Sequence, residues 1–210
     1  MTVLTNYLRR YTNIPALLHM LREQKLTLLD PQTWDDKNDS HYLSVYRDKR
    51  QVKCVLALCF AQVTETYHHW RVFADGSSGV CVSFHRGKLL AALHRQKGVT
   101  TRDVEYVRID KLAKRKVKIE ELPFLKRAPY GDEREFRVIF ESKTETLNAL
   151  NIPIPLACID RVILSPWLSK ALQDHLKNTI HEIKGCKSLK ITATSLISNE
   201  RWKSFAEQAR

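Results

Sequence analysis

The 210-residue sequence has little glycine and proline, with six and seven residues respectively. A long linker or low-complexity tract is rich in such residues, so neither is expected, and no internal repeat is evident. No apolar run reaches the roughly 18 residues of a membrane-spanning helix, and the longest, at 54–63, predicts a buried strand. The N-terminus has no signal-peptide pattern, so we expect a cytoplasmic protein that does not associate with a membrane.

Several sequence motifs of known chemistry are missing as well. There is no G-x-G-x-x-G, P-loop, G-x-S-x-G or H-E-x-x-H motif, which disfavours dinucleotide-binding Rossmann domains, P-loop NTPases, serine hydrolases and zincins. The cysteines form no C-x-x-C pair and have no histidines at zinc spacing, so we expect free thiols and no metal site. The five cysteines are Cys54, Cys59, Cys81, Cys158 and Cys186.

The composition is that of a globular protein, with 43% hydrophobic and 28% charged residues, and the length suits one domain at 1–210. Strands and helices alternate irregularly, which predicts an α+β fold with a central mixed, mostly antiparallel sheet flanked by helices. Strands are predicted at 4–12, 25–29, 52–63, 79–84, 103–109, 133–141, 159–164 and 189–193. Helices are predicted after Asn13 and at 67–75, 88–96, 169–183 and 199–208, and in part of 111–126, with an ordered loop at 33–40.

The chain is strongly basic, with 35 Lys and Arg against 23 Asp and Glu, a net charge of +12. Two-thirds of this excess lies between residues 85 and 128. Such a field attracts nucleic acid, nucleotide phosphates or an acidic protein, although a solvated helix face explains it equally well. The candidate nucleic-acid-binding residues are Lys114, Arg115, Lys116, Lys118, Lys126 and Arg127.

Two glutamates lie at the predicted start of the strand at 133–141. Strand alternation places Glu133 and Glu135 on one face, where their mutual repulsion raises the cost of ionising both. Such a pair can bind a cation, hold ribose hydroxyls or stabilise an oxocarbenium-like transition state. The alternative is a charged face in which both glutamates pair with Arg or Lys across the sheet.

Other segments offer groups that could bind a ligand. Arg9 and Arg10 place two guanidiniums, which suit phosphates, beside the aromatic Tyr11, although an exposed strand with salt bridges is as good an explanation. Trp70 and Arg71 precede a small-residue turn containing Ser77 and Ser78, which either admits a ligand or simply connects a helix to a strand. The acidic cluster of Asp35, Asp36 and Asp39 suits Mg²⁺ or Ca²⁺, but turn formation explains it more simply.

The segments that carry a family resemblance are Leu8–Tyr11, Leu26–Leu28 with Pro31, Trp34–Asp39, Leu58–Phe60, Trp70–Ala74, Gly79–Phe84, and Lys126, Tyr130, Glu133, Glu135 and Arg137. In this order they resemble a bacterial family of unknown function that includes the AbiGi-type abortive-infection proteins, over about residues 4–198. That family is more distantly similar to the ADP-ribosyltransferase fold.

The resemblance implies an NAD-dependent ADP-ribosyltransferase that acts as a toxin-like effector in anti-phage defence, on a nucleic acid or other anionic target. An antitoxin or other defence-system partner would accompany it. Glu135 would be catalytic and Glu133 would polarise the acceptor. The residues expected to bind NAD are Arg9, Arg10, Tyr11, Trp70, Arg71, Ser77 and Ser78. The alternatives are a nuclease using Asp36, Asp39, Glu133 and Glu135 with Mg²⁺, and a non-catalytic nucleic-acid-binding or partner-binding module.

Overall fold

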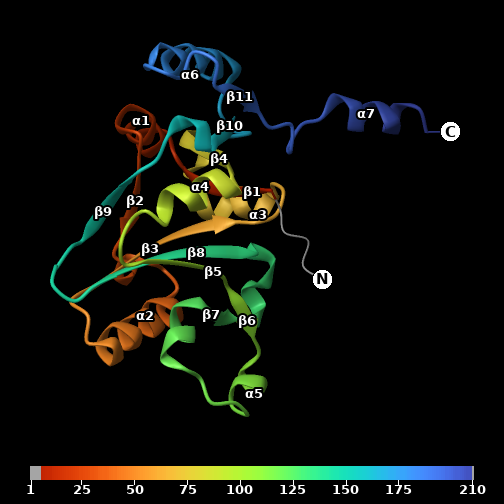
Figure 1. Cartoon of the computed structure of the whole chain (residues 1–210). Coiled ribbons are helices and arrows are strands. Elements are labelled where there is room, and N and C mark those ends of the chain that lie inside the picture. The colour runs from red at the N-terminus through yellow and green to blue at the C-terminus, as the bar shows by residue number, and fades with distance from the viewer. Residues whose placement is uncertain (1–5, 210) are drawn as a thin grey trace.

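The structure is a computed structural model that describes residues 6–209 (Figure 1). The strands are β1 (Tyr7–Asn13), β2 (Lys25–Leu29), β3 (Cys54–Ala61), β4 (Gly79–His85), β5 (Val99–Asp103), β6 (Glu105–Val107), β7 (Leu125–Arg127), β8 (Glu135–Ser142), β9 (Ala149–Pro153), β10 (Ile159–Leu164) and β11 (Lys190–Ala193). The helices are α1 (Ile14–Glu23), α2 (Lys37–Arg50), α3 (Tyr67–Phe73), α4 (Arg86–Leu93), α5 (Ile109–Leu112), α6 (Lys170–Glu182) and α7 (Glu200–Glu207).

Nine of these strands form one mixed, mostly antiparallel sheet, in which β10 and β11 are the parallel pair. The order β11-β10-β4-β1-β3-β2-β9 gives one path through it, and β8 and β5 extend it from the other edge of β3. Strands β6 and β7 form a separate two-stranded sheet. The predicted α+β fold with a mixed, mostly antiparallel sheet flanked by helices is confirmed.

Strand β3 is the branch point of the sheet. Its apolar sequence is buried on both faces, as expected for a central strand. One edge pairs with β8 along its whole length. The other edge is shared, because β1 pairs with it only at Arg9↔Ala61 and β2 only at Leu29↔Ala57. Residues 58–60 lie between these two contacts, where the sheet opens.

Helices cover both faces of the sheet. Even-numbered residues of β3 and β8 join the main core with the apolar faces of α1 and α4. Odd-numbered residues of the same strands face α2, whose Leu43 packs against Val55 and Ile139. On the same side, Trp70 of α3 packs on Tyr11 and Cys81. The prediction that Phe136, Val138 and Phe140 share one face is confirmed, since all three lie in the main core.

Most predicted elements are confirmed with small shifts at their ends, and residues 4 and 5 of the first predicted strand lie outside the described residues. The loop predicted at 33–40 is wrong in part, because α2 begins at Lys37 and the Asp36 side chain caps it by accepting from the backbone N–H of Asn38. The strand predicted at 103–109 is broken, because buried Val104 separates β5 from β6.

The strand predicted at 133–141 begins later than expected. Residues Ala128–Glu133 form a 3₁₀ helix, and Arg134 ends it in the left-handed region with φ of 45°. β8 therefore starts at Glu135, and Glu133 lies on the preceding turn rather than on the strand. Among residues 6–209, no helix is both long enough and apolar enough to span a bilayer.

Candidate active site

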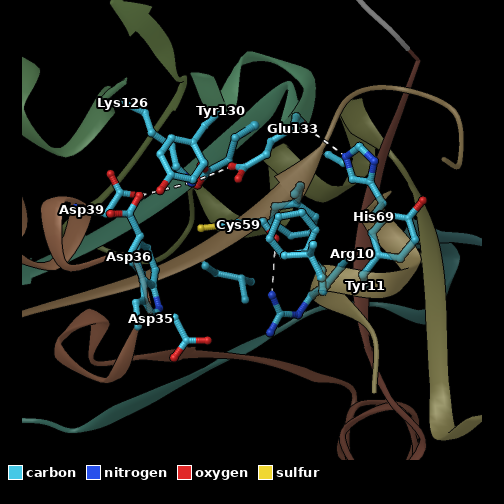
Figure 2. Close-up of a pocket in the computed structure, with 18 of the residues that line it drawn as sticks. Arg10, Tyr11, Asp35, Asp36, Asp39, Cys59, His69, Lys126, Tyr130 and Glu133 are labelled. Atoms are coloured by element: carbon cyan, nitrogen blue, oxygen red, sulfur yellow. Dashed lines mark hydrogen bonds and ion pairs between the residues drawn. The ribbon is translucent and has the colours of Figure 1, made fainter. Parts of the chain in front are cut away.

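A cavity of about 620 Å³ lies where β1 and β2 diverge from the edge of β3. Residues 57–61 of β3 line it consecutively, so backbone peptide groups as well as side chains face the space. Figure 2 shows Asp39, Lys126 and Tyr130 on one side, Arg10, Tyr11 and His69 on the other, and the Cys59 sulfur between them. The volume is within the range of small-molecule and cofactor sites.

The acidic side of the cavity is a buried charge cluster. Arg137 donates from Nε to Glu135 Oε1 at 2.7 Å and from Nη2 to Glu135 Oε2 and Asp39 Oδ2, both at 2.8 Å. Lys126 Nζ lies 2.6 Å from Glu133 Oε2, 3.5 Å from Glu135 Oε2 and 3.4 Å from Asp39 Oδ2. Three carboxylates therefore face two cations, which leaves one excess negative charge if all are ionised.

This arrangement separates the pKa values of the two glutamates. Burial opposes ionisation of Glu135, but the adjacent Arg137 outweighs it and lowers the pKa of Glu135 to about 2. Burial raises the pKa of Glu133, and the hydrogen bond from Lys126 offsets this only in part. Glu135 is thus a fixed negative charge, whereas Glu133 is suited to exchange a proton. Divergent pKa values in one site are typical of divided acid–base roles.

His69 of α3 holds the Glu133 turn from the opposite side. Its Nε2 lies 3.2 Å from the carbonyl oxygen of Glu133, and its Nδ1 lies 2.6 Å from the hydroxyl oxygen of Thr66. A carbonyl only accepts, so Nε2 carries the proton and Nδ1 accepts from Thr66. Burial lowers the pKa of His69, which agrees with this neutral tautomer. Its ring also stacks on Tyr11, with centroids 5.3 Å apart.

The basic side of the cavity comes from β1. The Arg9 guanidinium donates to the carbonyl of Val63 at 2.8 Å, and that of Arg10 donates to the carbonyl of Cys59 at 3.4 Å. Within residues 6–209 neither guanidinium forms an ion pair with a carboxylate. Burial lowers the pKa of Arg10, because its charge is partly removed from water. An anionic ligand group would supply the missing counter-charge.

Two aromatic rings border the acidic side. The Arg137 guanidinium lies over the ring of Trp34, 5.2 Å from its centroid, and Lys126 Nζ lies 4.8 Å from that of Tyr130. Both rings line the cavity. Flat apolar surfaces beside fixed charges suit a ligand with planar rings.

The structure brings together only some of the predicted NAD-binding residues. Arg9, Arg10 and Tyr11 line the cavity with Glu133 and Glu135. Trp70 does not, because it is completely buried behind Tyr11, with its indole N–H donated to Glu65. Arg71 lies on the exposed side of α3, stacked over the ring of Trp167 at 4.1 Å. Ser77 and Ser78 are in the turn before β4, outside the cavity lining.

The predicted nucleic-acid-binding residues also separate. Lys126 belongs to the buried cluster, with 9% of its side chain exposed, so its charge is engaged by carboxylates. Arg115 forms a two-point ion pair with Glu105 through bonds of 2.9 and 3.0 Å. The remaining four residues are exposed around α5 and at the end of β7: Lys114, Lys116, Lys118 and Arg127.

The sequence assigns no site role to Arg137, His69 or Trp34, offers Asp39 only as a candidate metal ligand, and groups Lys126 with the nucleic-acid-binding residues. Alternation gave one usable signal, because Arg137 is two residues after Glu135 and must share its face of the strand. The alternative explanation, pairing of both glutamates with Arg or Lys, describes their contacts correctly, although the pairs are buried. No local pattern indicates that α2 and α3 carry Asp39 and His69 to this strand.

The acidic residues are poorly arranged for a metal ion. The oxygens of Asp39, Glu133 and Glu135 accept from Lys126 and Arg137, and Asp36 is occupied in capping α2. Over residues 6–209, no group of three or more His, Cys, Asp and Glu side chains is placed to hold a metal. A divalent cation would have to displace ammonium and guanidinium groups from these carboxylates.

No protein-family model matches the sequence, and no curated protein matches it. Among solved structures, the chain is similar to Thermus sp. 2.9 DarT in complex with NAD⁺, with a TM-score of 0.46 and 11% identity over 92% of this chain and 98% of that chain. For the complex of the same protein with carba-NAD⁺ the TM-score is 0.46 and the identity 10%, over 90% of this chain and 95% of that chain. For its complex with ADP-ribosylated ssDNA the TM-score is 0.46 and the identity 11%, over 90% of this chain and 94% of that chain.

Proposed function

We propose that the chain is an NAD-dependent ADP-ribosyltransferase that acts as a toxin-like effector in anti-phage defence on a nucleic acid or other anionic target. The observation that carries the proposal is one cavity with a glutamate pair on one side and, on the other, two guanidiniums that have no carboxylate partner among the described residues. A ligand that fits must have anionic groups for Arg9 and Arg10, and hydroxyls or a cationic end for Glu133 and Glu135. NAD⁺ has a pyrophosphate, ribose hydroxyls and a cationic nicotinamide ring.

The residues present fit this ligand class. Arg9 and Arg10 would hold the pyrophosphate, and Tyr11 and Trp34 offer ring surfaces for the planar groups. On the edge of β3 away from β8, residues 58–60 pair with neither β1 nor β2 within residues 6–209. Peptide groups on this edge can therefore form hydrogen bonds with an amide or a base. We propose no NAD-binding role for Trp70, Arg71, Ser77 or Ser78, which do not line the cavity.

Each glutamate has a distinct role in the proposed reaction. NAD⁺ supplies an ADP-ribosyl group whose bond to nicotinamide breaks, with the electron pair leaving on nicotinamide. Glu135, held ionised by Arg137, accepts a hydrogen bond from a ribose hydroxyl and stabilises positive charge that develops at the sugar carbon. Glu133 takes the proton of the acceptor as its lone pair forms the new bond to that carbon.

The proposed defence role rests on the resemblance of the sequence motifs, in their order along the chain, to the family that includes the AbiGi-type proteins. The proposed target rests on that resemblance and on the net charge of +12. The exposed Lys114, Lys116, Lys118 and Arg127 would attract a polyanion from a distance. An antitoxin or other defence-system partner, and a cytoplasmic location, are parts of the same proposal. One domain spanning 1–210 suffices for it.

The test is incubation of the full chain with radiolabelled NAD⁺ and with single-stranded DNA, RNA or protein, followed by measurement of nicotinamide release and label transfer. Glu135→Gln and Glu133→Gln should each strongly lower the rate of transfer, whereas Arg134→Gln, at the exposed residue between them, should retain it. Failure of the wild-type chain to consume NAD⁺ with every acceptor would overturn the proposal. Chelator-sensitive cleavage of nucleic acid would support the nuclease instead.

A further inference from the structure

The residue row that crosses the sheet through Arg9 carries further cations beyond the cavity. The register pairs Arg9 with Ser83 of β4, Ser83 with Arg161 of β10, and Arg161 with Lys190 of β11. Side chains paired across neighbouring strands point to the same face. Arg9, Arg161 and Lys190 therefore share a face, with the small, buried Ser83 between the two arginines.

The packing of the next residues identifies this face. Val82 and Val162, which alternate with Ser83 and Arg161, lie in the main core beneath α1 and α4. Cys81 and Ile163, two residues along, lie on the opposite face against Trp70 of α3. The cationic row is therefore on the face of the sheet that carries α3, and it reaches the cavity at Arg9.

The row is accessible and carries a positive net charge. Arg161 is 36% exposed in its side chain, Lys190 is exposed and Arg9 is half-buried. Arg161 donates from Nε to Asp160 at 2.6 Å. Within residues 6–209 its two terminal Nη groups form no other hydrogen bond, so they can contact a phosphate. With strands about 4.8 Å apart, the three cations extend over about 14 Å. Three cations against Asp160 leave a formal charge of about +2.

An aromatic pair flanks the row. Tyr7 and His85 are cross-strand partners on β1 and β4, two residues from Arg9 and Ser83, and so point to the same face. Their rings lie 5.4 Å apart, and both residues are half-buried. A line of cations beside aromatic rings is typical of surfaces that hold single-stranded nucleic acid, where phosphates meet the cations and bases stack on the rings.

We infer that this face, the Arg9–Lys190 row, binds single-stranded nucleic acid and directs it to the mouth of the cavity. Acidic protein segments also bear negative charge, but they have no flat bases to use the Tyr7–His85 pair. The role of the bound strand as acceptor rests on the proposed function, whereas its binding at the row does not.

The test is fluorescence anisotropy of a labelled 20-nucleotide single-stranded DNA or RNA, titrated with the full chain at several salt concentrations. Arg161→Gln/Lys190→Gln should weaken binding at least about fivefold and reduce the salt slope by about 1.4, at about 0.7 for each lost phosphate contact. The matched control is Lys49→Gln/Lys143→Gln, which removes the same charge from exposed residues at the end of α2 and just after β8 and should weaken binding less than twofold. Arg161→Lys/Lys190→Arg preserves the charge and should restore binding.

Unchanged affinity in Arg161→Gln/Lys190→Gln, or an equal loss in the control, would overturn the inference. Binding of poly-glutamate as tight as that of the oligonucleotide, and lost in the same variant, would also overturn it and assign the row to an acidic protein. Circular dichroism establishes that each variant is folded. If the wild-type chain consumes no NAD⁺ while the row variants lose oligonucleotide binding, the proposed function fails and the binding site stands.

Discussion

Arg137 and Glu135, two residues apart on one strand, form a two-point ion pair in which Nε and Nη2 reach the two carboxylate oxygens at 2.7 and 2.8 Å. Both side chains are almost completely buried, with 1% and 6% exposed. Alternation along β8 makes the pairing possible, and a further hydrogen bond from Arg137, to Asp39, ties α2 to the strand. The charge that the proposed reaction needs is therefore set by a contact that also supports the fold.

Replacing Arg137 with methionine should lower the free energy of unfolding by about 3–5 kcal/mol, because Glu135 and Asp39 would remain buried without their main counter-charge. Urea denaturation monitored by circular dichroism measures the change. Arg134→Gln, three residues earlier and exposed, should change stability by less than about 0.5 kcal/mol. Arg137→Met/Glu135→Gln should recover part of the loss, and a double variant less stable than Arg137→Met would contradict this account.

The two glutamates should differ in the pH dependence of transfer. The pKa of Glu133 is raised by burial, so its base form is lost as pH falls through that raised value, and the rate should fall with it. Glu133→Gln should lower the rate by about 10²–10⁴ and remove this pH dependence. Glu135, whose pKa is about 2, stays ionised throughout, so Glu135→Gln should lower the rate at every pH and keep the slope. Identical pH profiles for the two variants would refute the division of roles.

Two arginines provide a matched comparison for ligand binding. Arg10 lines the cavity and has no carboxylate partner within residues 6–209, so Arg10→Gln should weaken NAD⁺ binding about 10- to 100-fold, equivalent to about 1.5–3 kcal/mol for a charged hydrogen bond. Arg71, stacked on Trp167 at the surface, should have less than a twofold effect when changed to Gln. Isothermal titration calorimetry measures both, and a larger effect from Arg71 would show that the ligand binds outside the cavity.

The sheet is largely predictable from the sequence, because the apolar runs of β3 and β4 and the alternating apolar residues of β8 indicate buried strands. Helix α2 is not, since Asp36 and Asn38 favour turns as strongly as helix caps, and the sequence predicts a loop at 33–40 and no element at 41–50. The predicted strand at 133–141 includes Glu133, because the sequence does not show where the strand begins. Alternation continues backwards through Arg134, and only the left-handed conformation of that residue shows where the strand stops.

The predictions from the sequence group Arg9 and Arg10 with Glu133 and Glu135 in one candidate site, and all four residues line one cavity. The family resemblance also groups Trp70 and Arg71 with them. The orientation of α3 instead buries the indole and exposes the guanidinium. Tertiary packing, which a local pattern does not encode, also decides that Lys126 points into the carboxylate cluster rather than to solvent.

His69 should make stability fall in mild acid. Its pKa is lowered by burial in the folded state, below the ordinary value of 6.5. Between these two values the unfolded chain binds a proton that the folded chain does not, so stability rises with pH. The contribution is complete above about pH 6.5 and is lost as pH falls below it, by at most about 1.4 kcal/mol per pH unit.

The measurement is the free energy of unfolding at pH 7.5 and pH 5.5 for the wild type, His69→Gln and His68→Gln. His69→Gln removes the titrating ring, so its stability should fall less between the two pH values than that of the wild type. His68 is exposed on the same helix and lowers the pKa of His69 less than burial does, so His68→Gln should keep most of the wild-type difference. A wild-type difference retained in His69→Gln would show that His69 is not held neutral between Thr66 and the Glu133 carbonyl.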